Sequence, residues 1–325
     1  MTLLRLSPLA LSRSRFALSP LAETLGTLIE LGKSQPDPSF AAWHARHHPV
    51  FTAAIATDPF ARGLVRLLSS TKWLPEHVVL PPLDGMRTTL GPELARVAAF
   101  SDQRVRAQLE QSVAHSWQRH DLSWLAGTGW AVRTAELLRA VWVGHVEPDW
   151  PRRRAVLERD VTYRAGLLAA YGWPGALRQM SRRSTWVGAD AIRFSNQSFP
   201  DRVVGDEGML FVPVSVSSGT WLCEGPSGQY AQVYPARGFA TLSAVRPPRA
   251  LARLLGPGRA AVLHELAVPA TTSELAAQLS QSVGTIGGHL AVLREADLVA
   301  GTRVGRRVVY RRTELGELLV GERAD

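Results

Sequence analysis

Apolar residues recur every three to four positions through much of the first 180 residues, which predicts amphipathic helices. The clearest periods cover residues 20–31, 101–117, 131–143 and 150–172. Helix-start signals support them: serine precedes proline at Ser7 and Ser19, Ser101 opens the second period, and Asp149 precedes the fourth. The sequence therefore predicts a mainly helical N-terminal region.

The pattern changes between about Trp186 and Tyr234. The segments "GMLFVPVSV", "TWLCE" and "YAQVYP" are short, rich in β-branched and aromatic residues, and bounded by Gly, Pro, Ser and Asp. These features predict strands of a small sheet.

A break follows at Pro247 and Pro248, after which a new helical period begins. All ten tryptophans lie before the break, the last being Trp221. We therefore predict an α+β protein with two domains: residues 1–245 as a helical and β N-terminal region, and residues 246–325 as a separate C-terminal domain.

In the C-terminal domain, "RALARLL" and "GRAAVLHELAV" form two apolar-periodic pieces. "ATTSELAAQLS" then begins at Thr271 or Thr272 as the cap, with Glu274 in the position of a capping carboxylate. A short turn leads to Ser282, the expected N-cap of another helix. This arrangement predicts a helix-turn-helix.

Two adjacent glycines, Gly287 and Gly288, stand inside that last helix, where each costs roughly 0.5–1 kcal/mol relative to alanine. At 100° per residue, one face of the helix is apolar and is expected to pack on the preceding helix, and Gly288 points away from it. The residues of the apolar face are Val283, Ile286, Leu290 and Leu293. We interpret the glycines as the bare exposed face of a helix that another molecule approaches closely.

After this helix, two alternating segments surround Gly305 and predict a hairpin rich in arginine. The arginines that crowd it are Arg303, Arg306, Arg307, Arg311 and Arg312. The chain carries a net charge of +9 at pH 7, and this hairpin is where the charge gathers. A clustered basic patch beside an exposed helix is typical of nucleic-acid binding, with the helix in the major groove and the arginines on phosphates or the minor groove.

The segment from Thr271 to Leu319 resembles the winged helix-turn-helix of ArsR-type bacterial transcription factors, since helix, turn, second helix, "HLAVLREA", wing and "VVYRRTELG" occur in register. Upstream segments such as "FALSPLAETLGTLIEL" and "YPARGFATL" are similar to a longer actinobacterial subgroup. The resemblance implies DNA contacts from three groups of residues. These are Thr272 and Ser273; Gln281, Ser282, Gly284, Thr285, Gly287, Gly288 and His289; and the wing arginines Arg303, Arg306 and Arg307.

The sequence departs from this family in three places. Ser280 stands where the turn usually has glycine, Asp297 replaces the glycine that usually ends the recognition helix, and Gly287 and Gly288 replace a polar pair on the reading face. Asp adopts the left-handed backbone conformation more readily than most residues, so Asp297 suits its position.

Other candidate chemistry is weak. The thiolate metal sensing common in ArsR-type proteins needs cysteines, and Cys223 is the single cysteine of the chain, so we expect no metal and no cofactor. We interpret the histidines of "HARHH", at 44, 47 and 48, as exposed on a short helix. The arginines of "PRRRAVLERD" are interpreted as a solvated helix face. The tryptophans are interpreted chiefly as core residues.

No run of apolar residues is long enough to span a membrane, and one cysteine suits a reducing compartment, so we expect a cytoplasmic protein. We find no constellation of catalytic residues and expect no enzymatic activity.

Together these features predict a DNA-binding transcriptional regulator that binds double-stranded DNA as a homodimer and acts as a repressor. A small-molecule effector, if one exists, is expected to bind the N-terminal region. The alternative is a winged helix that serves as a protein-interaction or DNA-tethering module on an uncharacterised catalytic or scaffold domain.

Overall fold

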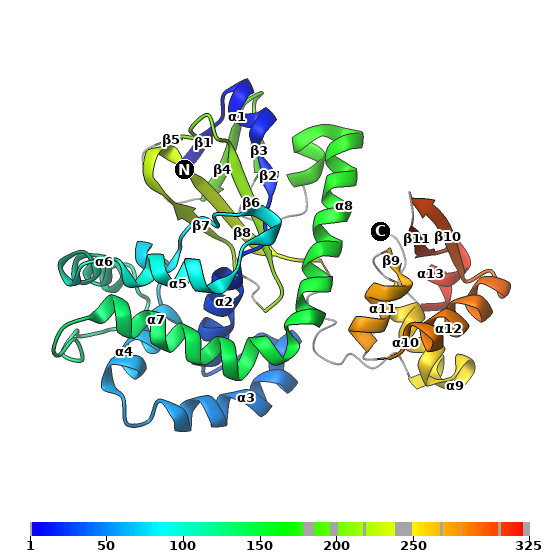
Figure 1. The fold of residues 1–325 in the computed structure, drawn as a ribbon, viewed down its shortest axis with the longest axis horizontal. Coiled ribbons are helices and arrows are strands. Elements are labelled where there is room, and N and C mark those ends of the chain that lie inside the picture. The colour runs from blue at the N-terminus through cyan, green and yellow to red at the C-terminus, as the bar shows by residue number, and fades with distance from the viewer. Residues whose placement is uncertain are drawn as a thin grey trace. The chain divides into compact units, whose positions relative to one another are not determined.

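A computed structural model describes residues 2–177, 185–195, 201–216, 219–237, 249–266, 269–279, 281–304 and 307–320. The chain divides into two compact units, and the elements of both are labelled in Figure 1, where the colour follows residue number. The N-terminal unit comprises Met1–Pro148 and Arg164–Ala236, and the C-terminal unit comprises Asp149–Tyr163 and Arg237–Asp325. The expected domain boundary at 245/246 falls in residues 238–248, outside the described residues. The expected mixture of helices and sheets is confirmed.

Helices make up most of the N-terminal unit. They are α1 (Pro8–Arg13), α2 (Pro20–Gly32), α3 (Ala41–Ala54), α4 (Pro59–Leu68), α5 (Leu90–Ala98), α6 (Asp102–Ala114), α7 (Trp130–Val141) and the second half of α8 (Trp150–Leu177), with short 3-10 turns at Pro38–Phe40, Glu76–Val78 and Gly85–Arg87. The caps predicted at Ser7 and Ser19 are confirmed, because each serine Oγ accepts a hydrogen bond of 3.0 Å from the main chain three residues later. Ser101 caps α6 in the same way.

The cap predicted at Asp149 is wrong. A π-helical turn, Trp142–Val146, runs into a 3-10 turn, Glu147–Asp149, and this turn leads directly into α8. Because Asp149 lies inside a helical turn, α8 has no free N-terminus there. Within α8, Gly172 has a positive φ of 69°, which marks a kink.

Two four-stranded sheets accompany these helices. One has the order β3 (Thr185–Val187), β4 (Ala191–Ser195), β1 (Thr2–Arg5), β5 (Arg202–Val203); the other has the order β2 (Arg15–Phe16), β6 (Met209–Val214), β8 (Tyr230–Pro235), β7 (Trp221–Glu224). The strands predicted between about 186 and 234 are therefore confirmed. The strands β1 and β2 lie in the segment that was predicted to be mainly helical, and the sequence pattern did not predict them.

Helix α2 forms the centre of the N-terminal unit and is buried on almost every side. Its polar groups find partners inside the core. The Glu93 carboxylate accepts from Ser19 Oγ at 2.6 Å and from Leu21 N–H at 2.8 Å, while Glu23 accepts from the N–H and hydroxyl of Ser215 in the segment after β6. These bonds satisfy donors that burial would otherwise leave unpaired.

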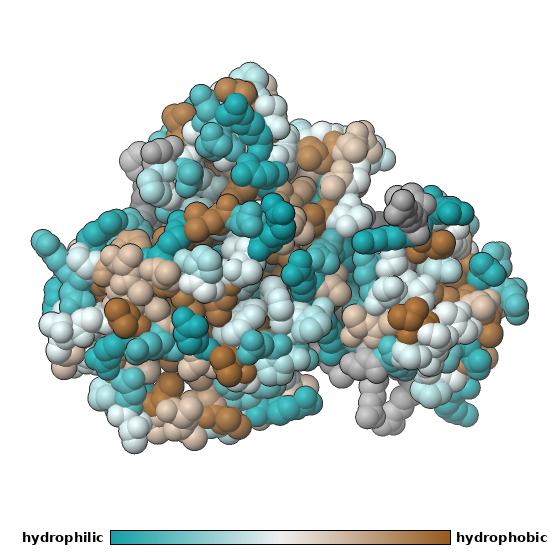
Figure 2. All heavy atoms as spheres, in the orientation of Figure 1, coloured by the Kyte–Doolittle hydropathy of each residue, from teal (hydrophilic) through white to brown (hydrophobic). Residues whose placement is uncertain are grey.

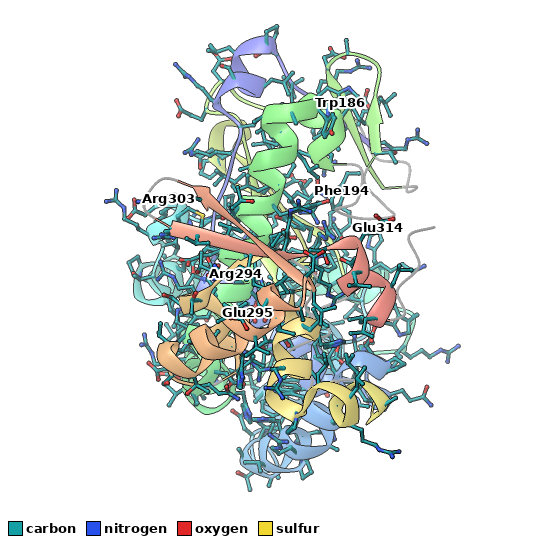
Figure 3. The ribbon with its side chains drawn as sticks, turned by 90° about the vertical axis from the view of Figure 1, so that its right-hand side faces the viewer. Trp186, Phe194, Arg294, Glu295, Arg303 and Glu314 are labelled. Atoms are coloured by element: carbon teal, nitrogen blue, oxygen red, sulfur yellow. The ribbon has the colours of Figure 1, made fainter. Side chains whose placement is uncertain are left out.

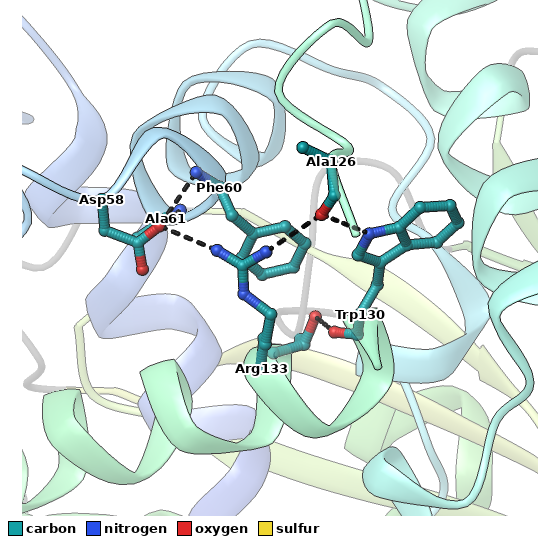
Figure 4. Close-up of polar contacts among 7 residues, drawn as sticks. Asp58, Phe60, Ala61, Ala126, Trp130 and Arg133 are labelled. Carbon is teal, nitrogen blue, oxygen red and sulfur yellow. Dashed lines mark hydrogen bonds and ion pairs between the residues drawn. The ribbon is translucent and has the colours of Figure 1, made fainter. Parts of the chain in front are cut away.

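Arg133 of α7 links three parts of the helical core (Figure 4). Its guanidinium lies 3.0 Å from the Asp58 carboxylate, stands over the Phe60 ring at 4.3 Å from the centroid, and donates to Ala126 O at 3.4 Å. Asp58 also caps α4 through the N–H groups of Phe60 and Ala61. One arginine therefore anchors α7 to the start of α4.

The C-terminal unit contains short helices and a small sheet around one apolar core. Its elements are the first half of α8, α9 (Arg249–Leu255), α10 (Pro257–Glu265), β9 (Ala270–Thr271), α11 (Thr272–Leu279), α12 (Val283–Glu295), β10 (Val299–Val304), β11 (Arg307–Arg312) and α13 (Glu314–Val320). The sheet has the order β10-β11-β9, with antiparallel neighbours. The predicted helices and the predicted hairpin are thus present.

The first half of α8 belongs to this unit by specific contacts. Arg159 donates to Glu265 O at the end of α10 at 3.4 Å, and its guanidinium lies 4.0 Å from the Glu265 carboxylate. Asp160 accepts from the main chain of Arg237 at 2.9 Å, and the Arg237 guanidinium lies over the Tyr163 ring. The interpretation of this helix start as a solvated face is wrong in part, because Arg153, Arg159 and Asp160 are buried.

Candidate nucleic-acid interface

Helix α11 begins with a reciprocal pair of hydrogen bonds between Thr271 and Glu274. The Thr271 N–H donates to Glu274 Oε2 at 2.7 Å, and the Glu274 N–H donates to Thr271 Oγ1 at 3.4 Å. This is a capping box, and it identifies Thr271 as the cap of the two threonines proposed. Thr272 is half-buried and Ser273 is exposed in the first turn of the helix.

A tight turn connects α11 to α12. Gln281 N–H donates to Ala276 O at 3.0 Å, and Ser282 then caps α12 by accepting from Thr285 N–H at 3.0 Å, as predicted. The hydroxyls of Ser282 and Thr285 are also hydrogen-bonded to each other at 2.8 Å. Ser280, the residue that replaces the family's usual glycine, lies outside the described residues.

One face of α12 is buried in the core of the C-terminal unit. Ile286, Leu290 and Leu293 are at most 1% exposed and pack in the same cluster as Leu275 of α11. Val283 was expected on this face but is 54% exposed. It lies at the first helical position, where the packing of α11 does not reach it, so the apolar face begins one turn later.

The opposite face of α12 is open. A β-carbon built on Gly287 or Gly288 would meet nothing within 4 Å, and one on Gly284 would meet only Ser282 Oγ, at 3.8 Å. The expectation that core packing does not require these glycines is confirmed. Gln281, Ser282, Gly284, Thr285 and Gly288 are all exposed.

His289 differs from the other residues expected to contact DNA. Its ring packs against Gly258 of α10 so closely that a β-carbon on Gly258 would lie 2.5 Å from His289 Nε2. The imidazole is half-buried and contributes to the packing of α12 on α10. The predicted orientation of this side chain toward DNA finds no support in that position.

The strands β10 and β11, residues 299–304 and 307–312, form the C-terminal hairpin, with Arg303 opposite Val308 and Val304 opposite Arg307. Arg303, Arg307 and Arg311 are exposed, whereas Arg306 lies outside the described residues. In the turned view of Figure 3, Arg303 lies on this hairpin, Arg294 and Glu295 lie at the end of α12, and Glu314 begins α13. The hairpin therefore offers solvent-facing cations, as a phosphate contact requires.

Arg312 does not join these exposed arginines and corrects the expected cluster. It is 4% exposed, donates to Leu263 O at 2.7 Å and His264 O at 2.6 Å, and pairs with Glu317 at 2.9 Å. With Arg159 on Glu265 O, two guanidinium groups bind the last carbonyls of α10. Burial raises the pKa of the Glu265 carboxyl, and Arg159 opposes that shift.

Helix α12 ends at Glu295, and Asp297, two residues later, has a φ of 56°. Asp is among the few non-glycine residues that adopt this left-handed conformation at modest cost. The prediction that Asp297 tolerates the left-handed conformation is confirmed. The conformation lets the chain turn from α12 into β10.

The other groups of candidate residues lie in the N-terminal unit. His44 Nε2 lies 3.0 Å from Lys33 O and His48 Nδ1 lies 2.8 Å from Leu31 O, so both rings bind the end of α2. The expectation that these histidines are simply exposed is wrong for His44, which is 7% exposed. Among the residues that the structure describes, no three His, Cys, Asp or Glu side chains are grouped to hold a metal ion.

The tryptophans are divided between core and surface. Trp130 and Trp221 are buried in the helical core, whereas Trp117 is 60% exposed. On the face drawn in Figure 2, hydrophobic residues form separate spots among hydrophilic ones. No helix in the described part of the chain is both long and apolar enough to cross a membrane.

A family model of the helix-turn-helix domain matches residues 254–302. The match covers α10, α11, α12 and the first residues of β10, the elements whose geometry is given above. No curated protein and no solved structure matches the chain. The C-terminal unit therefore contains a helix-turn-helix domain, which indicates DNA binding.

Proposed function

We propose that this protein is a sequence-specific regulator of transcription of the winged ArsR type, which places α12 in the major groove of double-stranded DNA. The observation that carries the proposal is the open face of α12, held from behind by Ile286, Leu290 and Leu293 inside a helix-turn-helix match. A helix with one buried face and one bare face can enter the groove as a rigid body.

The C-terminal hairpin acts as the wing in this proposal. Exposed Arg303 and Arg307 contact phosphates beside the groove. Arg306, the third wing arginine of the sequence prediction, lies outside the described residues. Such contacts supply affinity that depends on salt and little on base sequence. The base sequence is then read by α12.

The proposed regulator is a cytoplasmic repressor that binds as a homodimer to two half-sites about one helical turn apart. Leu254 of α9 and Leu315 and Leu318 of α13 support a second copy, since each is at least 50% exposed on a helix that flanks the helix-turn-helix. Light scattering on the purified full chain tests this, with a dimer mass expected. An effector would bind the N-terminal unit.

The direct test is binding of the full chain to a random pool of DNA duplexes, followed by footprinting of the sequences recovered. A protected and roughly palindromic site, with affinity that falls steeply as salt rises, is the expected result. A flat salt dependence and no recovered consensus would refute DNA recognition.

The double variant Arg303→Ala, Arg307→Ala separates DNA binding from the alternative function, a module for protein interaction, which does not require a loss of DNA affinity. A DNA binder loses affinity by a similar factor on all duplex sequences, and its salt slope falls by about one for each phosphate-binding arginine that is removed. Arg139→Ala, which removes an exposed arginine of the N-terminal unit, is the matched control and leaves binding unchanged.

A further inference from the structure

The face of α12 that points away from the core carries an unusual set of groups. Thr285, Gly288 and Val292 follow one another at spacings of three and four residues, so they share one side of the helix. Val292 is 44% exposed, although it is aliphatic and the other face of the same helix is buried in the core. Two of these three positions, Thr285 and Val292, carry methyl groups.

The two hydroxyls of the first turn are hydrogen-bonded within the helix. Ser282 Oγ accepts from Thr285 N–H, and the Ser282 and Thr285 hydroxyls bond to each other. The Thr285 hydroxyl is thus held toward Ser282, and the Thr285 methyl group is the aliphatic part of this exposed side chain. Together with the Val292 isopropyl group, it makes an aliphatic reading surface on either side of Gly288, where a side chain is lacking.

In the major groove one base presents an aliphatic group, because thymine carries a 5-methyl group on its exposed edge. Resting on the proposed DNA-binding function, we infer that Thr285 and Val292 recognise thymine methyl groups and are specificity-determining residues of this protein. The absence of a side chain at Gly288 lets the helix approach closely enough for both contacts.

The spacing gives the inference a geometric consequence. Seven residues of helix rise about 10.5 Å, and successive base pairs are about 3.4 Å apart. The two recognised thymines are therefore expected about three base pairs apart within one half-site.

Replacing thymine by deoxyuridine tests this, because the substitution removes only the 5-methyl group. The probe is a duplex recovered from the random pool with the full chain, with each dT changed to dU in turn. We expect about three- to fivefold weaker binding at two positions about three base pairs apart, the scale of one methyl contact each.

Variants then assign each methyl to its residue. Val292→Ala is expected to lose the response to dU at one position, and Thr285→Ser, which keeps the hydroxyl, at the other. Val283→Ala is the matched control: it removes the same atoms from another exposed valine of α12 that points about 160° away from Thr285, and it leaves both responses intact.

The outcomes separate the inference from the function on which it rests. If the protein binds a defined site in a salt-dependent way but its affinity does not change when dT is replaced by dU, the thymine inference is overturned and the regulator proposal stands. Failure to bind any duplex would overturn both. Loss of the dU response in Val283→Ala as well would also overturn the assignment, because the effect would then not belong to the reading face.

Discussion

Gly316 of α13 packs directly against the main-chain carbonyl of Leu298, with no room between them for a side chain. Thr313 holds the two segments together, since its N–H donates to Leu298 O at 3.1 Å and its hydroxyl accepts from Gly316 N–H at 3.1 Å. The first turn of α13 is thus tied to the start of β10.

Gly316→Ala is expected to destabilise the C-terminal unit by about 1–3 kcal/mol, because the new methyl group collides with a main-chain atom that cannot rotate away. Faster amide hydrogen exchange in α13 and β10 is the measurement. Exchange that stays as slow as in the wild type would show that the helix shifts without cost.

Gly288→Ala is the same chemical change in open space and has the opposite effect on stability. Alanine at this helical position is expected to gain about 0.5–1 kcal/mol in denaturant unfolding. If the helix backbone approaches DNA closely at Gly288, the same variant binds DNA about tenfold more weakly. Undiminished affinity would mean that close approach is the wrong explanation for the glycine.

Gly287→Ala serves as the comparison for that experiment. It lies one residue earlier in equally open space, but at the edge of the exposed face. A similar gain in stability with a smaller loss of affinity is expected.

Variants of the neighbouring residues Arg311 and Arg312 are expected to affect different properties: DNA affinity for Arg311 and the free energy of unfolding for Arg312. Arg312→Met removes the donors to Leu263 O and His264 O and leaves Glu317 without its partner, so we expect a loss of about 3–5 kcal/mol in unfolding free energy. Arg311→Met removes an exposed cation of the same hairpin and is expected to change stability by less than about 0.5 kcal/mol, with weaker DNA binding. Equal effects of the two variants on unfolding would contradict the assigned roles.

Glu93 makes the stability of the N-terminal unit depend on pH. Burial raises the pKa of its carboxyl from 4.5 to about 7, against the hydrogen bonds from Ser19 and Leu21. Because the folded state holds the proton more tightly than the unfolded state, this contribution is complete below pH 4.5 and is lost as pH rises through 7. Relative to the wild type, Glu93→Gln is expected to gain up to about 3 kcal/mol across that window.

Denaturant unfolding of both proteins between about pH 4 and 8 measures that difference. The buried His77 ring, whose pKa is lowered to about 4 by burial, acts in the opposite direction, so the wild-type curve alone is a poor reporter. His77 is common to both proteins and cancels in the comparison. A difference that does not change with pH would refute the role of Glu93.

The C-terminal unit was largely predictable because its signals are local. Ser282, the Thr271 to Glu274 pair and the left-handed Asp297 each act within four residues of chain, so sequence spacing reveals them. Val292 was also within reach, because it follows Thr285 by seven residues and therefore shares its face.

The features that escaped prediction depend on distant partners. Strand β1 exists because Leu3 pairs with Arg193, and Arg312 is buried because α10 ends beside it. The orientation of the His289 ring was also beyond prediction, since only its contact with Gly258 shows that the ring packs inward. Local spacing contains no information about contacts of this kind.

The first half of α8 has a consequence for the order in which the protein can fold. During synthesis residues 149–163 emerge before residues 164–236, which belong to the other unit, and only then does the remainder of the C-terminal unit follow. Arg159 must therefore await Glu265 until the intervening segment has left the ribosome. The C-terminal unit is therefore completed late in translation, when its two parts close a long loop. Its folding rate depends on the folding of residues 164–236, which stand between those two parts in the sequence.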